Sequence, residues 1–490
     1  DAALYDTVHA VGMALCPELG ISIPVGKDSL SMKTQWTHEG KTHKVTSPVS
    51  LIITAFASLD SVAGTLTPQL NREAPDTSLL LIDLAQGQKR MGGSILAQVR
   101  NVAGGSVPDL DDPQRLVALV HAINDLRQAG LIMAYHDKSD GGLLAAVAEM
   151  AFAGQVGVAL TMDLLLEDGN PSADQGDAKN WATQIGPRRH AHTLQALFNE
   201  ELGVVLQCDT AKRAEVTAIL RQHGLSKHAH WVGKTRPMSS TIDAGKQQLQ
   251  IWRDAKCIFS AALSDLHQVW DSVSWKICQL RDNPQTADSE HAATGQPADP
   301  GMHVHLSFDP SAAGTQGPVA PAYLHRRPKV AILREQGVNS HIEMARAFDL
   351  AGFEAVDTHM SDLQTGRAQL QDFQGLVACG GFSYGDTLGA GIGWARSITF
   401  NPRLSEAFAA FFARPDTFGL GVCHGCQMFA ELATLIPGTE HWPRFTTNQS
   451  ERFEARLSMV EICESPSLFL QGMAGSRLPI AVAHGEGYAN

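Results

Sequence analysis

The sequence predicts a multidomain chain of α/β and α+β type. Its 490 residues, 44% of them hydrophobic and 18% charged, are enough for several domains with buried cores. Strand patterns alternate with helical patterns along most of the chain. From Pro328 onward the alternation is regular, which is typical of a doubly wound parallel sheet.

The strands and helices follow from local patterns. In the first half, apolar runs of strand length occur in SLLLIDL and EELGVVLQC, and helical patterns occur in GGLLAAVAEMAFAG and AEVTAILRQHG. From Pro328, strands are predicted for PKVAILRE, FEAVDTH, GLVACGG and FGLGVC. Helices are predicted for NSHIEMARAFDLAG, SEAFAAFFARP and HGCQMFAELATL.

Composition divides the chain into four regions. Residues 1–67 contain a helix, a Gly/Pro turn and the strand-like run SPVSLIITAFASL, and residues 68–270 form an α+β domain with a polar insertion at about 167–190. Residues 271–327 contain a helical stretch and, from residue 282, a Pro/Gly/Ala-rich linker. Residues 328–490 form the doubly wound domain. The first residues lie in an apparent helix, and the last residues lie within the strand and helix pattern of the doubly wound domain. We therefore expect a fragment of a longer protein.

Charge and cysteine usage restrict the function classes. The net charge of −13 argues against nucleic acid or an anionic membrane as the main partner. Most of the eight cysteines are scattered singly, as in proteins of a reducing compartment. No apolar run reaches the roughly 18 residues of a membrane helix. We expect a cytoplasmic protein without a membrane or nucleic-acid partner.

The segment LGVCHGCQMF contains a candidate nucleophile, Cys423. This cysteine follows the predicted strand FGLGVC and precedes a predicted helix, within the pattern G-x-C-x-G. A sharp strand-to-helix turn of this kind holds a nucleophile at the carboxyl edge of a sheet, and the helix N-terminus favours the thiolate. A redox C-x-x-C pair with Cys426, half of a zinc site, and two buried structural cysteines are the alternatives.

The glycine pair in GLVACGGFSYGD is a candidate oxyanion hole. Gly380 and Gly381 follow another buried strand, so that their N–H groups can turn toward the same sheet edge. Together with the N–H of His424 they would stabilise the oxyanion formed when Cys423 builds a thioester. The alternative is a plain turn that ends the strand.

Several segments together resemble one enzyme family. GVCHGCQ, CGGFSYGD, LREQGVNSHIEMA and RPDTFG are similar to the class I (triad) glutamine amidotransferase domain, a flavodoxin-like fold, of large single-chain phosphoribosylformylglycinamidine synthases. PVGKDSLSMKT, AYHDKSDGGLLAAVAEMAFAG, LFNEELGVV, WPRFTTNQSERFEAR and PIAVAHGEG resemble the same family in the same order. Two departures are His424, where asparagine is expected, and Tyr488, where arginine is usual.

The resemblance implies a ligase that uses glutamine as nitrogen donor. Its substrates would be formylglycinamide ribonucleotide, L-glutamine and ATP with Mg²⁺, acting in purine biosynthesis. Residues 1–270 would be the second half of a synthetase portion related to aminoimidazole ribonucleotide synthetases, with glutaminase and synthetase on one chain, expected to be monomeric. In HDKSDGG, Asp137 would be a magnesium ligand and Ser139 would contact the nucleotide. The alternative is that Ser139 or Asp140 simply caps the next helix.

A second polar segment, VGKDSLSMK, carries Lys27, Asp28, Ser29, Ser31 and Lys33. Their spacing is that of a strand with polar side chains on one face. By the resemblance this face would contact phosphate or substrate, and the alternative is a solvated edge strand.

The general base of the glutaminase is not predicted within the chain. Triad glutaminases need a histidine and a carboxylate that orients it. His484 and Glu486 have suitable spacing, but in the family HGEG is a separate element, so the catalytic His and Glu are expected beyond Asn490. We expect no turnover from this chain alone. A catalytically incomplete scaffold and a glutaminase serving another synthase are the alternative functions.

Overall fold

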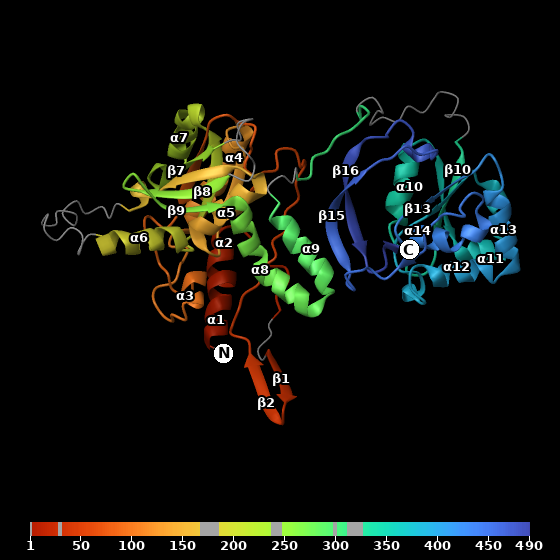
Figure 1. Cartoon of the computed structure of the whole chain (residues 1–490), viewed down its shortest axis with the longest axis horizontal. Helices are drawn as coiled ribbons and strands as arrows, with labels where there is room; N and C mark the ends of the chain where they lie inside the picture. The colour runs from red at the N-terminus through yellow and green to blue at the C-terminus, as the bar shows by residue number, and fades with distance from the viewer. Residues whose placement is uncertain (1, 28–31, 167–185, 237–246, 297–300, 311–326) are drawn as a thin grey trace, which may run out of the picture. The chain divides into compact units, whose positions relative to one another are not determined.

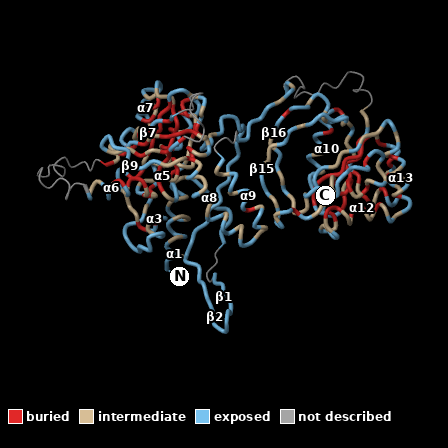
Figure 2. Tube along the Cα trace, viewed as in Figure 1, coloured by how far each residue is buried: buried red, intermediate tan, exposed pale blue. Residues whose placement is uncertain are grey.

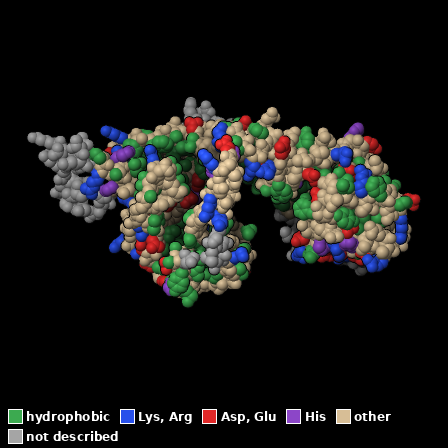
Figure 3. Space-filling view, turned by 90° about the horizontal axis from the view of Figure 1, so that it is seen from below, with side chains coloured by type: hydrophobic (Ala, Val, Ile, Leu, Met, Phe, Trp, Pro, Cys, Tyr) green, Lys and Arg blue, Asp and Glu red, His purple; other side chains and the backbone are tan. Residues whose placement is uncertain are grey.

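The computed structural model of the chain describes residues 2–27, 32–166, 186–236, 247–296, 301–310 and 327–490 (Figure 1). The chain divides into two compact units, Asp1–Asp271 with Thr294–Ala298, and Ser272–Ala293 with Asp299–Asn490. Buried residues concentrate around the main sheet of each unit (Figure 2). Among the described residues, no helix combines the length and apolarity needed to cross a membrane. Side chains of both charges are interspersed over the face seen in Figure 3.

The first 67 residues form short elements with little buried surface. They are α1 (Ala2–Val8), the π-helix η1 (His9–Leu15), α2 (Cys16–Glu18) and the antiparallel hairpin β1 (Lys33–His38) and β2 (Lys41–Thr46). The strand predicted for SPVSLIITAFASL is wrong, because residues 47–59 form no strand and Ile52 and Phe56 are 91% and 92% exposed. A strand needs partner strands and a covered face, and the described residues provide neither for this run.

The first unit is built around a seven-stranded sheet of order β4-β6-β3-β7-β5-β8-β9, antiparallel except for the pair β5–β8. The strands are β3 (Thr77–Asp83), β4 (Ala134–Lys138), β5 (Gly157–Thr161), β6 (Gly203–Asp209), β7 (Ala229–Arg236), β8 (Gln248–Arg253) and β9 (Lys256–Ala262). The helices are α3 (Ile95–Val99), α4 (Pro113–Gln128), α5 (Gly142–Gly154), α6 (Gly186–Phe198) and α7 (Arg213–Gln222). The predicted α+β class is confirmed.

Both faces of this sheet are covered. Leu79 and Leu81 of β3 pack with α5 on one face, whereas Leu80 and Ile82 pack with α4 and α7 on the other. This explains why SLLLIDL is apolar throughout instead of alternating. The polar insertion expected at about 167–190 lies largely outside the described residues, although α6 already begins at Gly186.

The predicted linker contains a helix. Following α8 (Leu263–Arg281), α9 spans Pro284–Thr294, so the expectation of irregular chain from residue 282 to 327 is wrong for this part. Asn283 caps α9, since its side chain accepts a hydrogen bond from Gln285 N–H at 2.9 Å. Trp275 also stacks on His291 at 4.1 Å between ring centroids. Capping and stacking order a segment whose composition suggested none.

The second unit contains the predicted parallel sheet. Its strand order is β11-β10-β12-β13, and every pair is parallel, which confirms the flavodoxin-like expectation. The strands are β10 (Lys329–Arg334), β11 (Glu354–His359), β12 (Gly375–Ala378) and β13 (Phe418–Gly421). The helices are α10 (His341–Leu350), α11 (Met360–Thr365), α12 (Ile392–Thr399), α13 (Pro402–Phe412) and α14 (His424–Glu431).

The two faces of this sheet carry different helices. Val330 and Ile332 face α10, whereas Ala331 and Leu333 face the core formed by α11 to α14. Two antiparallel pairs complete the unit: β14 (Phe445–Thr446) with β17 (Tyr488–Ala489), and β15 (Glu454–Glu461) with β16 (Arg477–His484). The carboxyl ends of β12 and β13 are adjacent, which brings the glycine pair and Cys423 together.

Candidate active sites

Cys423 occupies the turn between β13 and α14 in a strained backbone conformation. Its φ is 54° and its ψ is −118°, a region that L-residues rarely adopt. Such strain is characteristic of a nucleophile elbow. The flanking glycines are required by packing: a Cβ on Gly425 would collide with the Ala378 carbonyl, and one on Gly421 would lie 2.8 Å from Gly425 O. The geometry of the turn therefore explains the G-x-C-x-G pattern.

The two cysteines of the motif differ in environment. Cys423 is exposed, whereas Cys426 is half-buried, and burial raises the pKa of the Cys426 thiol. In the described part of the chain, no group of three or more His, Cys, Asp and Glu side chains is arranged to hold a metal ion. The zinc interpretation of this motif therefore gains no support.

The glycine pair lies against the Cys423 side chain. A Cβ on Gly380 would come within 3.5 Å of Cys423 Sγ, and Gly381 has a φ of 132°, which favours glycine. Within the described residues, no hydrogen-bond acceptor is found for the backbone N–H groups of Gly380, Gly381 and His424. Gly380 lies next to the exposed thiol, and N–H groups without an acceptor among the described residues are suited to stabilising an oxyanion.

His424 and the HGEG segment occupy distinct polar environments. The His424 side chain is buried, and its Nε2 lies 3.1 Å from Ser383 N. His484 Nδ1 is paired with Asn448 Oδ1 at 2.9 Å, while Glu486 accepts a hydrogen bond from Ala390 N–H. No hydrogen bond or ion pair between described residues joins His484 to Glu486. Each of the two side chains is therefore held by a partner outside the HGEG segment.

In the first unit, the HDKSDGG segment spans the end of β4, the loop that follows it and the first residue of α5. Asp137 and Ser139 are exposed at the carboxyl end of β4, and Asp137 Oδ1 accepts a hydrogen bond from Tyr135 Oη at 2.6 Å. Burial and this hydrogen bond raise the pKa of Tyr135 well above its usual value. Mg²⁺ is usually bound by one or two carboxylates together with phosphate oxygens, so Asp137 fits an ion carried on a nucleotide.

The loop is held by Glu200 and not by a side-chain cap. The N-cap residue of α5 is Gly141, which has no side chain to accept a hydrogen bond. The interpretation of Ser139 or Asp140 as the N-cap is therefore not supported. Instead, Glu200 Oε1 accepts hydrogen bonds from Gly141 N–H at 2.9 Å and from Ile95 N–H at 2.8 Å. Glu200 thereby ties the loop to the first turn of α3.

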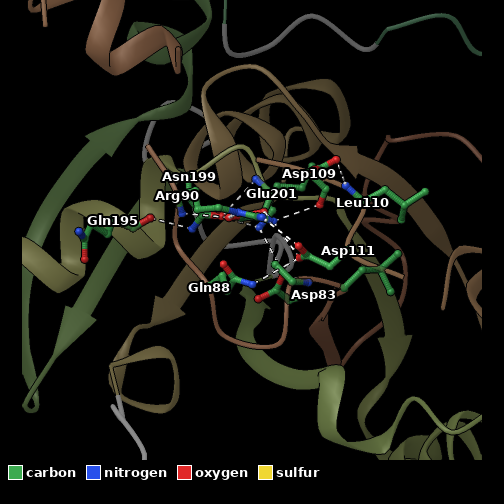
Figure 4. A network of polar contacts seen from close by, with 12 residues as sticks. Asp83, Gln88, Arg90, Asp109, Leu110, Asp111, Gln195, Asn199 and Glu201 are labelled. Atoms are coloured by element: carbon green, nitrogen blue, oxygen red, sulfur yellow. Dashed lines mark hydrogen bonds and ion pairs between the residues drawn. The ribbon is translucent and has the colours of Figure 1, made fainter. Parts of the chain in front are cut away.

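A network of charged and polar side chains in the same unit surrounds Arg90 and the buried Glu201 (Figure 4). Arg90 donates to both carboxylate oxygens of Glu201 at 2.7 Å and to Asp111 at 3.0 Å. These hydrogen bonds raise the pKa of Arg90. Lys138 is buried and donates to Asn199 Oδ1 at 2.8 Å, and burial lowers the pKa of Lys138. The network fixes β4, β6 and the segment around Arg90 relative to one another.

A cavity of about 440 Å³ opens beside the loop. Its lining combines polar groups with an apolar wall: Leu84, Leu116, Leu119, Val120, Ile123, Asn124, Tyr135, Asp137, Lys138, Ser139, Leu202, Gly203 and Val204. An apolar pocket with a few polar groups at one end is suited to a small organic ligand.

The segment VGKDSLSMK is only partly described. Asp28, Ser29 and Ser31 lie outside the described residues. Lys33 is the first residue of β1, but Lys27 is in irregular chain, so the predicted strand does not extend to it. Both lysines are exposed, and no hydrogen bond or ion pair between described residues joins them to Asp137 or Ser139. No contact between described residues therefore links the two predicted sites.

Three family models match successive parts of the chain. They are the FGAR-AT PurM_N-like domain over residues 1–58, the C-terminal domain of AIR synthase related proteins over 75–241, and the CobB/CobQ-like glutamine amidotransferase domain over 327–490. Their order is the order of the sequence motifs described above.

Solved structures show weaker similarity. PurLQS from Thermotoga maritima is 14% identical over 41% of this chain and 27% of that chain, with a TM-score of 0.28. PurL of T. maritima complexed with ATP is 13% identical; the match covers 46% of this chain and 28% of that chain, with a TM-score of 0.29. The hydrogenase maturation protein HypE is 15% identical over 40% and 55%, with a TM-score of 0.26. The chain spans less than a third of the first two chains.

The family assignment rests on the three matched domains and on the co-linear motifs. The first domain is particular to FGAR amidotransferases, and the other two are a synthetase-type and a glutaminase-type domain. Together, the three matches support the assignment of the chain to the phosphoribosylformylglycinamidine synthase (FGAR amidotransferase) family.

Proposed function

We propose that the chain takes part in the ATP-dependent, glutamine-hydrolysing amidation of formylglycinamide ribonucleotide to formylglycinamidine ribonucleotide in purine synthesis. The observation that carries the proposal is the strained, exposed Cys423 in contact with Gly380, whose backbone N–H has no acceptor among the described residues. A glutaminase serving an unrelated synthase is less well supported, because residues 75–241 match an AIR synthase related domain. In this proposal residues 1–270 belong to the synthetase portion and 328–490 to the glutaminase.

At the glutaminase site, Cys423 Sγ would attack the side-chain amide carbon of glutamine. The C–S bond forms and the amide oxygen becomes an oxyanion, which the N–H groups of Gly380, Gly381 and His424 would stabilise. The C–N bond then breaks, ammonia leaves with a proton, and water hydrolyses the thioester to glutamate. A histidine and a carboxylate that orients it would move the protons.

At the synthetase site, the γ-phosphoryl group of ATP would pass to the formamide oxygen of the substrate. Ammonia then adds to the activated carbon and phosphate leaves, giving the amidine, ADP and phosphate. Asp137 would hold Mg²⁺, which neutralises charge on the phosphates, and Ser139 would contact the nucleotide. Glu200 supports this assignment, because its hydrogen bonds to Gly141 and Ile95 fix the loop that carries Ser139 and directly follows Asp137 and Lys138 of β4.

The proposal is tested with the native protein, formylglycinamide ribonucleotide, ATP and glutamine. We expect amidine, ADP and glutamate in equal amounts, with glutaminase and synthetase on one monomeric cytoplasmic chain. Asp137→Asn should weaken the binding of MgATP measured by calorimetry, whereas Asp140→Asn is the matched control. Glutamine hydrolysis without any product from formylglycinamide ribonucleotide would contradict the proposed function.

A further inference from the structure

We propose that His424 is a positioning residue. Its imidazole holds the segment from Gly380 to Ser383, called here the oxyanion loop, against α14, the nucleophile helix that follows Cys423. The proposal rests on the function proposed above for Cys423. The side chain is 2% exposed, and its Nε2 lies 3.1 Å from Ser383 N. A backbone N–H can only donate, so Nε2 is the acceptor and the ring proton is on Nδ1. Nδ1–H then donates to Gln427 Oε1 at 3.0 Å.

The hydrogen bonds continue from Gln427 to the HGEG segment. Gln427 Nε2 donates to the Glu486 carbonyl oxygen at 2.7 Å, and the Glu486 carboxylate accepts from Ala390 N–H at 2.5 Å. His424 and Gln427 are three residues apart and lie on the same side of α14. Together they connect the loop after β12, the nucleophile helix, the HGEG segment and the turn before α12.

This connection restrains the glycine pair from one end. At the other end, Asn339 N–H donates to Gly380 O at 2.9 Å and Phe382 N–H donates to Gly337 O at 2.8 Å. Ser383, the residue that His424 binds, follows Gly381 by two positions. The peptide units of the oxyanion loop are thus fixed on both sides, so their N–H groups keep their direction when charge develops on a bound substrate.

The imidazole itself has little freedom to move. It stacks on Trp394 at 6.0 Å between ring centroids with an interplanar angle of 23°. Asp386 Oδ1 lies 3.7 Å from Nδ1, on the side of Gln427. An alanine at 424 would remove the acceptor for Ser383 N–H and leave a void beside Trp394. An asparagine would keep an acceptor on a shorter side chain.

The test compares two reagents that alkylate the Cys423 thiol of the full chain. In a chloromethyl ketone analogue of glutamine, the thiolate bonds to the carbonyl carbon and an oxyanion develops; sulfur then bonds to the methylene carbon as chloride leaves, the first C–S bond breaks and the ketone re-forms. With iodoacetamide the thiolate displaces iodide directly, and no oxyanion forms. The ratio of the two rates therefore reports on the oxyanion loop and not on thiol accessibility.

We expect His424→Ala to lower the chloroketone rate by about ten- to a hundredfold, the size of effect caused by a misplaced catalytic group. The iodoacetamide rate should stay unchanged, and His424→Asn should recover most of the chloroketone rate. His441→Ala, at an exposed position of the same unit, is the matched control and should alter neither rate.

Three results would overturn the positioning role. They are an unchanged chloroketone rate in His424→Ala, an equal fall of both rates, or an Asn variant as slow as the Ala variant. If His424→Ala does not fold, the Asn variant is compared with wild type. A ratio of the chloroketone rate to the iodoacetamide rate equal to that of wild type supports the role, and a lower ratio contradicts it. A wild-type chain whose Cys423 shows no preference for the chloroketone would contradict the proposed function as well.

Discussion

Gly380 lies directly against Cys423, since a Cβ built on it would come within 3.2 Å of Cys423 Cβ and 3.5 Å of Sγ. The loop after β12 and the turn that carries Cys423 are therefore in contact at a position where a side chain has little room. This contact follows from the adjacent, parallel strands β12 and β13, whose carboxyl ends carry the two segments.

Gly380→Ala should impair the glutaminase chemistry while leaving the fold intact. The added methyl group must displace the Cys423 side chain or the loop by a few tenths of an ångström. We expect the reaction of Cys423 with the glutamine chloroketone to slow by about tenfold, with an unchanged far-UV circular dichroism spectrum. A variant that reacts as fast as wild type would show that the loop does not form the oxyanion site.

The thiols should react in an order set by burial. Cys423 is exposed, whereas burial raises the pKa of Cys426 and raises that of Cys379 to about 11. At neutral pH we expect iodoacetamide to modify Cys423 well before Cys426 or Cys379, as measured by mass spectrometry of peptides. The exposed Cys257 and Cys463 serve as references for an accessible thiol. Faster modification of Cys426 than of Cys423 would contradict the assignment of the nucleophile.

Gly425→Ala should destabilise the second unit. A Cβ at this position collides with the Ala378 carbonyl of β12, and overpacking in a closely packed region costs about 1–3 kcal/mol. The measurement is the free energy of unfolding in urea. Gly485→Ala is the control, because a Cβ there meets nothing within 4 Å. Equal stability of the two variants would mean that the nucleophile turn can relax.

The patterns that depend on neighbours in sequence were predictable. PKVAILRE is apolar on both faces because helices cover both sides of β10, and G-x-C-x-G reflects contacts within one turn and its adjacent strand. SPVSLIITAFASL has an equally strong strand pattern, yet it forms no strand. A pattern shows that a segment could pair, but pairing also depends on partner strands elsewhere in the chain.

The supporting residues of the candidate sites were not predictable in the same way. Glu200 lies 59 positions from Gly141, and Glu486 lies 59 positions from Gln427, so no spacing rule connects them. LFNEELGVV was recognised as a family motif, but it gave no indication that Glu200 holds the HDKSDGG loop. Such contacts arise only when the strands are ordered within a sheet.

The stability of the first unit should fall in mild acid partly because of His267. Burial lowers the pKa of His267, whose ring stacks on Phe152 at 4.5 Å between centroids. At pH values well above 6.5, the usual pKa of histidine, His267 is neutral in both the folded and the unfolded state. As the pH falls below 6.5, the unfolded chain takes up the proton first, and stability is lost until the folded pKa is passed.

His267→Phe keeps the ring contact and removes the proton-binding group. We therefore expect the variant to lose less stability than wild type as the pH falls below about 6.5, measured as the free energy of unfolding in urea. His441→Phe, at an exposed position, is the control. Parallel pH profiles for wild type and His267→Phe would contradict the effect assigned to His267.

The most direct test of the central claim is product formation by the native protein and by Cys423→Ser, with either glutamine or ammonium as the nitrogen source. The substrates are formylglycinamide ribonucleotide and ATP. If Cys423 is the glutaminase nucleophile, the substitution abolishes the glutamine-driven rate and preserves the ammonium-driven rate. Retention of glutamine use by Cys423→Ser, or no amidation by the native protein with either nitrogen source, would contradict the assignment.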